Sequence, residues 1–258
     1  MTSRLPRTTF NRSGLVRILS ETIPEPHDPK YDFGERLGQW LDFSDALALF
    51  SVLNSGTEGT SAAHANTNSA AQSLRDQLAR VRRQLSESIL NDGVFGTEAA
   101  RIRFPVPLPQ ATAESAADYS PYHRYYLTHQ RDMNTSIGAL RGNARKILAE
   151  TSPSHRQLAD LDATLEKALA GRERNLLGTI PMLVARRFAQ RYQEHRDALS
   201  EAASDEPANW TQPGSWLEAF CRDTQAVLLA ELELRLKPVA GLIAALGDGG
   251  NPTQVTKQ

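Results

Sequence analysis

Residues 119–133, YSPYHRYYLTHQRDM, hold the densest group of side chains that could do chemistry. The stretch contains four of the chain's six tyrosines and two of its six histidines. His123 and His129 are six residues apart, so on a helix they point about 240° away from each other. Two zinc ligands on one helix are normally separated by about three or four residues. The spacing therefore argues against a helical zinc site.

One stripe of this stretch has helical spacing: Tyr122, Tyr126, His129 and Met133. The separations of 4, 3 and 4 place these residues on one face, and we expect that face to pack against a neighbouring helix. The alternative is an aromatic platform for a base or a partner side chain, supported by Arg124 and Arg131.

Other catalytic templates are missing. The sequence has no GK dipeptide, no G-x-G-x-x-G and no G-x-S-x-G, so it offers no phosphate loop and no nucleophile elbow. Asp162 and Glu166 share a helical face but Asp160 does not, which favours a solvated helix flank over a nuclease metal site. We expect no metal and no cofactor.

Cys221 is the single cysteine, and no histidine lies within one helical turn of it. No catalytic motif was found, and the chain is predicted not to be an enzyme. A site assembled from separate helices around His129, His195 and Asp132 is the enzymatic alternative.

Arginine pairs at a spacing of four suggest a phosphate-binding surface. Acidic residues close in sequence offer the alternative of a salt-bridged, solvated surface; they are Glu150, Glu173, Glu194 and Asp197. The candidate nucleic-acid-binding residues are Arg141, Arg145, Lys146, Arg186, Arg187 and Arg191.

The elements that must position these side chains are predicted to be helices. Aromatic residues make up only 7% of the chain, and no stretch alternates in polarity long enough for a strand. We expect an all-α fold, an elongated bundle of long amphipathic helices with short N-terminal helices. The expected regions are an N-terminal helical region 1–100, a proline-rich connector 101–120, a C-terminal bundle 121–246 and a disordered tail 247–258.

Helix boundaries follow from caps and breakers. A short helix is expected after Ser13, and another is expected with Ser44 as its N-cap. A long helix is predicted over 70–91, and two more over 121–150 and from Ser152. The last helix starts at Ser215 with Glu218 in a capping box. Breaks are expected at Gly171, Gly178, Pro181 and Pro238.

The helix over 70–91 has a seam close to that of a coiled coil. It spans fewer than three heptads, so packing inside a bundle is at least as well supported as pairing between chains. The candidate partner-interface residues are Leu74, Leu78, Val81 and Leu85.

Composition limits the compartment and the partners. The net charge of −1 makes the whole molecule a weak attractor for nucleic acid or anionic lipid. No apolar run approaches the ~20 residues of a membrane span, and the N-terminus lacks an uninterrupted apolar core. We expect a cytoplasmic protein without a transmembrane segment.

Three segments carry a resemblance to a known family: YHRYYLTHQRDMNTSIGALRGNARKIL, LADLDATLEKALAGRERNLLGTIPMLVARRF and WLEAFCRDTQAVLLAELELRLKPVAGLIAAL. With GLVRILSE and RLGQWLDFSDALALFSVLN, the chain resembles a bacterial helical family of unknown function. That family is similar to accessory components encoded with the motor proteins of Zorya-type antiphage defence.

The resemblance implies a non-enzymatic cytosolic accessory or effector component. Such a component would bind a companion helical protein or the membrane components of a proton-driven motor complex. The alternative is a nucleic-acid-binding protein that contacts DNA through its arginine-rich helix faces. Homo-oligomers are also compatible with the sequence.

Overall fold

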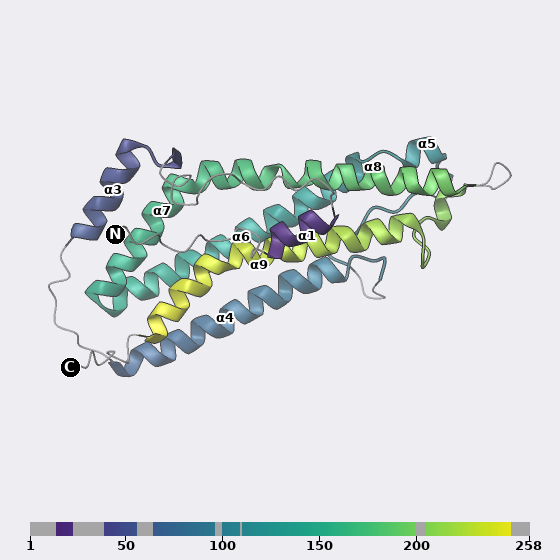
Figure 1. Cartoon of the computed structure of the whole chain (residues 1–258). Helices are drawn as coiled ribbons and strands as arrows, with labels where there is room; N and C mark the ends of the chain where they lie inside the picture. Colours follow the sequence, from purple (N-terminus) through teal and green to yellow (C-terminus); the bar gives the residue numbers. More distant parts are fainter. Residues whose placement is uncertain are drawn as a thin grey trace, which may run out of the picture. The chain divides into compact units, whose positions relative to one another are not determined.

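The structure is a computed structural model that describes residues 14–22, 39–55, 64–95, 100–108, 110–199 and 205–248. Every regular element in these ranges is helical, which confirms the all-α prediction (Figure 1). The helices are α1 (Gly14–Thr22), α3 (Phe43–Asn54), α4 (His64–Leu90), α5 (Ala113–Ala116), α6 (Ser120–Thr151), α7 (Pro153–Gly178), α8 (Ile180–Ala198), the short 3₁₀ helix η2 (Pro207–Asn209) and α9 (Trp216–Asp248).

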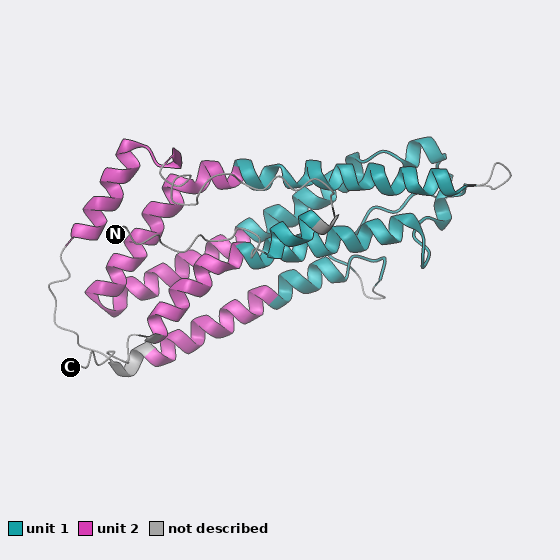
Figure 2. Ribbon diagram, in the orientation of Figure 1, with its two compact units in different colours: residues 1–30, 83–134, 175–234 teal, residues 31–82, 135–174, 235–258 magenta. Residues whose placement is uncertain are grey.

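The chain forms two compact units, shown in separate colours in Figure 2. Unit 1 comprises residues 1–30, 83–134 and 175–234, and unit 2 comprises residues 31–82, 135–174 and 235–258. Each unit is therefore assembled from three separate stretches of sequence. The expected connector 101–120 lies within unit 1.

The core of unit 1 is aromatic. The ring of Phe104 lies 5.3 Å from the rings of both Tyr122 and Tyr125. Phe188 and Phe220 complete the cluster, with ring centroids 5.1 Å apart in an edge-to-face arrangement. Such pairs add to the free energy gained from burying the rings themselves.

The stripe predicted on residues 122–133 is part of this core. Tyr122, Tyr126, His129 and Met133 are 4%, 0%, 2% and 1% exposed, respectively. The prediction that the stripe packs inside the protein is confirmed. A solvent-facing aromatic platform at these positions is excluded by the same burial.

The core of unit 2 is aliphatic. Leu74 of α4, Leu148 of α6 and Val239 of α9 are fully buried. Asn143 of α6 donates a hydrogen bond to Gln77 of α4 over 2.9 Å, which fixes these two helices side by side. Gly247, in the last turn of α9, lies beside the terminal guanidinium of Arg75 on α4, which brings these two helices together at this end of the unit.

Several helix starts agree with the capping signals, and one does not. α1 begins after Ser13, and α7 begins at Pro153, as expected. The N-cap of α3 is Asp42 and the prediction of Ser44 was wrong. Asp42 accepts from the backbone N–H of Asp45 and the Asp45 carboxylate accepts from Asp42 N–H, so a reciprocal capping box fixes the start two residues earlier.

The cap of α9 is close to the predicted one. The backbone N–H of Glu218 lies 3.5 Å from the Ser215 hydroxyl, and the Glu218 carboxylate accepts from Gly214 N–H. The predicted break at Pro238 was wrong, because α9 continues through it. Buried Leu236 and Val239 on either side of the proline hold the helix together although Pro238 has no N–H to donate.

Two other boundaries differ from expectation. α4 begins at His64, before the expected residue 70, and α7 runs through Gly171 to end at Gly178.

Residues 103–108 have no regular secondary structure, as the alternating prolines predict. Thr112 then caps the short helix α5, which the sequence pattern did not indicate. The apolar spacing of YDFGERLGQWL predicts a further helix over 31–41, which lies largely outside the described residues. Of the expected tail 247–258, Gly247 and Asp248 belong to α9 and the rest lies outside the described residues.

Candidate functional site

His129 is enclosed in unit 1 and is not placed to act on a substrate. Burial lowers the pKa of His129 to about 4, against an ordinary value of 6.5. Its Nε2 atom and the hydroxyl of Tyr125 have no hydrogen-bond partner among the described residues, and the two rings meet edge to face with centroids 4.7 Å apart. The imidazole is therefore neutral at physiological pH and serves as a packing group.

The other members of the three-residue enzymatic hypothesis have different partners. Arg101 forms an ion pair with Asp132. His195 Nε2 lies 2.9 Å from the Asp205 carboxylate, and its ring stacks on Trp216. No described contact joins His195 to His129 or to Asp132.

Cys221 is also unavailable for nucleophilic chemistry. Its thiol is fully buried and donates a hydrogen bond to the Asp92 carboxylate over 2.8 Å. Burial, with the hydrogen bond to Asp92 and its negative charge, raises the pKa of the Cys221 thiol well above the ordinary range. Gln225 donates to the same carboxylate, so the group ties α9 to the loop after α4. Among the described residues, no group of three or more potential ligands could hold a metal ion.

The first predicted basic pair belongs to a four-charge cluster in unit 2. Arg141 binds Asp162 bidentately at 2.7 and 2.9 Å, and it also reaches Glu166 at 3.0 Å. Arg145 contacts the same two carboxylates at 2.6 and 2.7 Å. The cluster is neutral overall. The guanidiniums are therefore occupied by α7 and do not form a free phosphate-binding face.

The pKa values in this cluster follow from the pairing. Burial raises the pKa of Asp162, but hydrogen bonds from Arg141 and Arg145 outweigh it, so the net shift is downward. Burial alone would lower the pKa of Arg141, whereas the bond to Asp162 raises it. Both groups remain charged in the folded protein.

The second basic pair is held in the same way in unit 1. Arg187 and Arg191 converge on the carboxylate of Asp223, at 2.7 and 3.0 Å. Lys146 and Arg186, the last two of the six candidates, are exposed and form no ion pair with a described residue. Of the six candidate nucleic-acid-binding residues, only Lys146 and Arg186 therefore keep a positive charge that no described carboxylate pairs with.

The predicted leucine seam is partly used inside the chain. Leu74 and Leu85 are 0% and 2% exposed, whereas Leu78 and Val81 are half-buried. Leu74 and Leu85 pack inside the chain, which explains their helical spacing without a partner protein. Only Leu78 and Val81 could still contribute to an interface.

An apolar surface open to solvent lies on one side of α3, where Phe43, Leu47, Phe50 and Leu53 are 80%, 52%, 65% and 59% exposed. At ~100° per residue these four side chains fall within about 120° of the helix circumference. Val52 points the opposite way and Leu49 lies beside the edge of this face, and both are half-buried. We call the four exposed residues the α3 apolar face.

α3 is held to unit 2 by its C-terminal end. The side-chain amide of Gln157, on α7, donates to the backbone carbonyls of Val52 and Leu53 at 2.9 and 3.0 Å, and to that of Ser55 at 3.3 Å. These are carbonyls that a helix end leaves without partners. The clamp fixes α3 without covering its apolar face.

Sequence reasoning did not find the α3 apolar face. The separations of 4, 3 and 3 in FSDALALFSVLN are those of one helix side, but the segment also has leucine or valine on its opposite side. Periodicity alone could not tell which side would be covered. The weak signal was the scarcity of charged residues, since Asp45 is the only one in the helix.

The fold and these surfaces define an all-α protein in which Cys221 and His129 are buried and the arginine pairs Arg141/Arg145 and Arg187/Arg191 are bound to carboxylates. The chain belongs to the family described as "Protein of unknown function (DUF3348)", whose model matches residues 1–248. No curated protein and no solved structure gave a significant match. Across the described residues, no helix combines the length and the apolarity needed to cross a membrane.

Proposed function

We propose that this chain is a non-enzymatic accessory or effector component that works by binding a companion protein. The observation that supports it most is the α3 apolar face, because none of the residues of α3 is buried. Taking ~200 Å² for a whole phenylalanine side chain, Phe43 and Phe50 alone expose roughly 290 Å². Leu47 and Leu53 extend this area into the range in which a contiguous apolar patch, roughly 300–600 Å², is often functional.

The partner that suits this surface is another amphipathic helix. A helix side with anchors at spacings of 4 and 3 fits the apolar side of a second helix, as in other helix-mediated complexes. The α3 apolar face carries no charge, so recognition by charge complementarity is not offered there. A helical companion protein provides the matching surface.

The resemblance of the sequence to accessory components of Zorya-type antiphage defence supports a particular setting. In that setting the companion is a cytosolic helical protein or a component of the membrane proton-driven motor, and this chain acts in the cytoplasm. The burial of Cys221 and His129 agrees with a role that involves no catalysis by those residues.

The experiment is co-purification of the full chain with each protein encoded beside its gene, followed by light scattering of the eluted species. The proposal expects one neighbour to form a stable complex of defined mass. Failure of every neighbour to bind would overturn the companion-protein function.

A further inference from the structure

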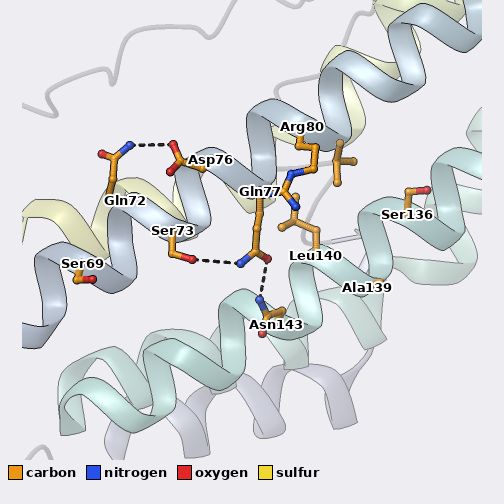
Figure 3. A pocket seen from close by; sticks show the side chains of 11 residues that line it. Ser69, Gln72, Ser73, Asp76, Gln77, Arg80, Ser136, Ala139, Leu140 and Asn143 are labelled. Atoms are coloured by element: carbon orange, nitrogen blue, oxygen red, sulfur yellow. Dashed lines mark hydrogen bonds between the residues drawn. The ribbon is translucent and has the colours of Figure 1, made fainter.

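An open groove of about 850 Å³, lined by both polar and apolar side chains, lies between α4 and α6, entirely within unit 2. α4 lines it from Ser69 to Val81, and α6 lines it from Ser136 to Asn143. Figure 3 shows the short side chains Ser136 and Ala139 on the α6 side, which leave the space open. A volume of this size is typical of ligand-binding sites.

Hydrogen-bonding amides span the groove. Asn143 Nδ2 donates to Gln77 Oε1 over 2.9 Å, and Gln77 Nε2 reaches the hydroxyl of Ser73 at 3.4 Å (Figure 3). Each amide has two donor hydrogens and one acceptor oxygen, so both keep unused capacity beyond these bonds. A ligand in the groove would therefore meet the free donor and acceptor capacity of Gln77 and Asn143.

Arg80 gives the groove a cationic end. Its guanidinium, drawn in Figure 3, forms no hydrogen bond or ion pair with a described residue. Arg141 and Arg145 on the facing helix are both bound to carboxylates. A planar guanidinium binds carboxylates through two parallel hydrogen bonds. Asp76 lies one turn away and also lines the groove, so a singly charged carboxylate is favoured over a doubly charged phosphate.

The length of the groove suits an extended peptide. From Ser69 to Arg80, α4 rises ~16 Å at 1.5 Å per residue, which matches about five extended residues. None of the lining side chains is aromatic, so stacking of a base or a sugar ring is not offered.

We propose that this groove binds an extended peptide segment of about five small or polar residues that ends in a free carboxylate. The carboxylate pairs with Arg80, and the peptide backbone forms hydrogen bonds with Gln77 and Asn143. This site is separate from the α3 apolar face, and it stands or falls independently of the companion-protein proposal.

The test uses the full chain labelled with ¹⁵N and a pool of N-acetylated pentapeptides made of Gly, Ala, Ser, Asn and Gln. One pool has free C-terminal carboxylates and the other has C-terminal amides. The free-acid pool is expected to shift the backbone amide signals of 69–81 and 136–143, with affinity roughly tenfold higher than that of the amide pool.

Substitutions separate the contributions. Arg80→Gln is expected to lower the affinity for the free-acid pool roughly tenfold, to the level of the amide pool. Arg83→Gln, an exposed arginine on the same helix outside the groove, should leave it unchanged. Ser136→Leu fills the groove and should abolish binding of both pools.

Three outcomes would overturn the inference. Equal binding of the two pools would remove the role of Arg80, and signal shifts elsewhere, or none at millimolar peptide, would remove the site. Acetate alone producing the same shifts at the same concentration would reduce it to a simple anion site without peptide recognition.

Discussion

Replacing His129 by methionine should flatten the dependence of stability on pH. His129 is 2% exposed and burial lowers its pKa to about 4, whereas the unfolded chain titrates near 6.5. Between pH 6.5 and pH 4 the imidazole of His129 is protonated in the unfolded state but stays neutral in the folded state. The stability contributed by the neutral imidazole is therefore present above pH 6.5, and it is lost progressively as the pH falls towards 4.

The magnitude follows from the difference between the two pKa values. Full loss amounts to ~3.4 kcal/mol at 1.36 kcal/mol per pKa unit, and about 2 kcal/mol of it should disappear between roughly pH 7 and pH 5. Methionine is of similar size and cannot titrate, so His129→Met removes this part of the slope. Groups that titrate in both proteins cancel in the comparison.

The assay is urea unfolding followed by circular dichroism at several pH values in that interval. His123→Met is the matched control, because His123 is exposed on the same helix and should keep the wild-type slope. Parallel stability curves for wild type and His129→Met would refute the reasoning, since they would mean that His129 is not held neutral by burial.

Two further predictions concern the free energy of unfolding, measured by the same urea titrations at neutral pH. Asp162→Asn removes the charge of one of the two carboxylates that Arg141 and Arg145 share, leaving Glu166 alone, and should destabilise the fold by roughly 2 kcal/mol; Asp160→Asn, which removes an exposed neighbouring carboxylate that pairs with no described cation, should change the free energy of unfolding little, and equal effects would contradict the assigned role of Asp162. Pro238→Ala should stabilise the protein by about 1–3 kcal/mol, because Pro238 is exposed inside α9 and alanine restores an N–H donor; a loss of stability would mean that the proline is needed for the path of α9.

The sequence was most informative where local spacing decides the structure. The stripe that includes Tyr126 and Met133 was predicted as packing surface, because its separations of 4, 3 and 4 require one helix face and its composition suits a core. The start of α7 at Pro153 was predicted for a similar reason, since proline favours the first helical turn.

The partners of charged residues could not be predicted in this way. Of the acidic residues proposed from sequence, Glu194 does contact Arg191, at 3.8 Å. The closer partners are Asp162, Glu166 and Asp223, which other helices contribute. An ion pair between two helices depends on how the helices pack. The spacing of residues along one helix therefore cannot predict it.

The α3 apolar face was missed because burial is not a local property. Its leucines and phenylalanines would look the same in a buried helix, and only the packing of unit 2 leaves Phe43 and Phe50 exposed. The continuation of α9 through Pro238 has a related cause: contacts of Leu236 and Val239 in the core outweigh a local preference for a break.

The central claim is that the α3 apolar face binds the companion protein. The most direct measurement is the Kd of the full chain for that companion by titration calorimetry, for wild type and for Phe43→Gln/Phe50→Gln. Phe43 and Phe50 are exposed in this chain and would be covered by the companion, so losing both should weaken binding by roughly a hundredfold or more. Met182→Gln, at an exposed apolar residue on α8, should leave the Kd unchanged. A double variant that binds as tightly as wild type would contradict the account.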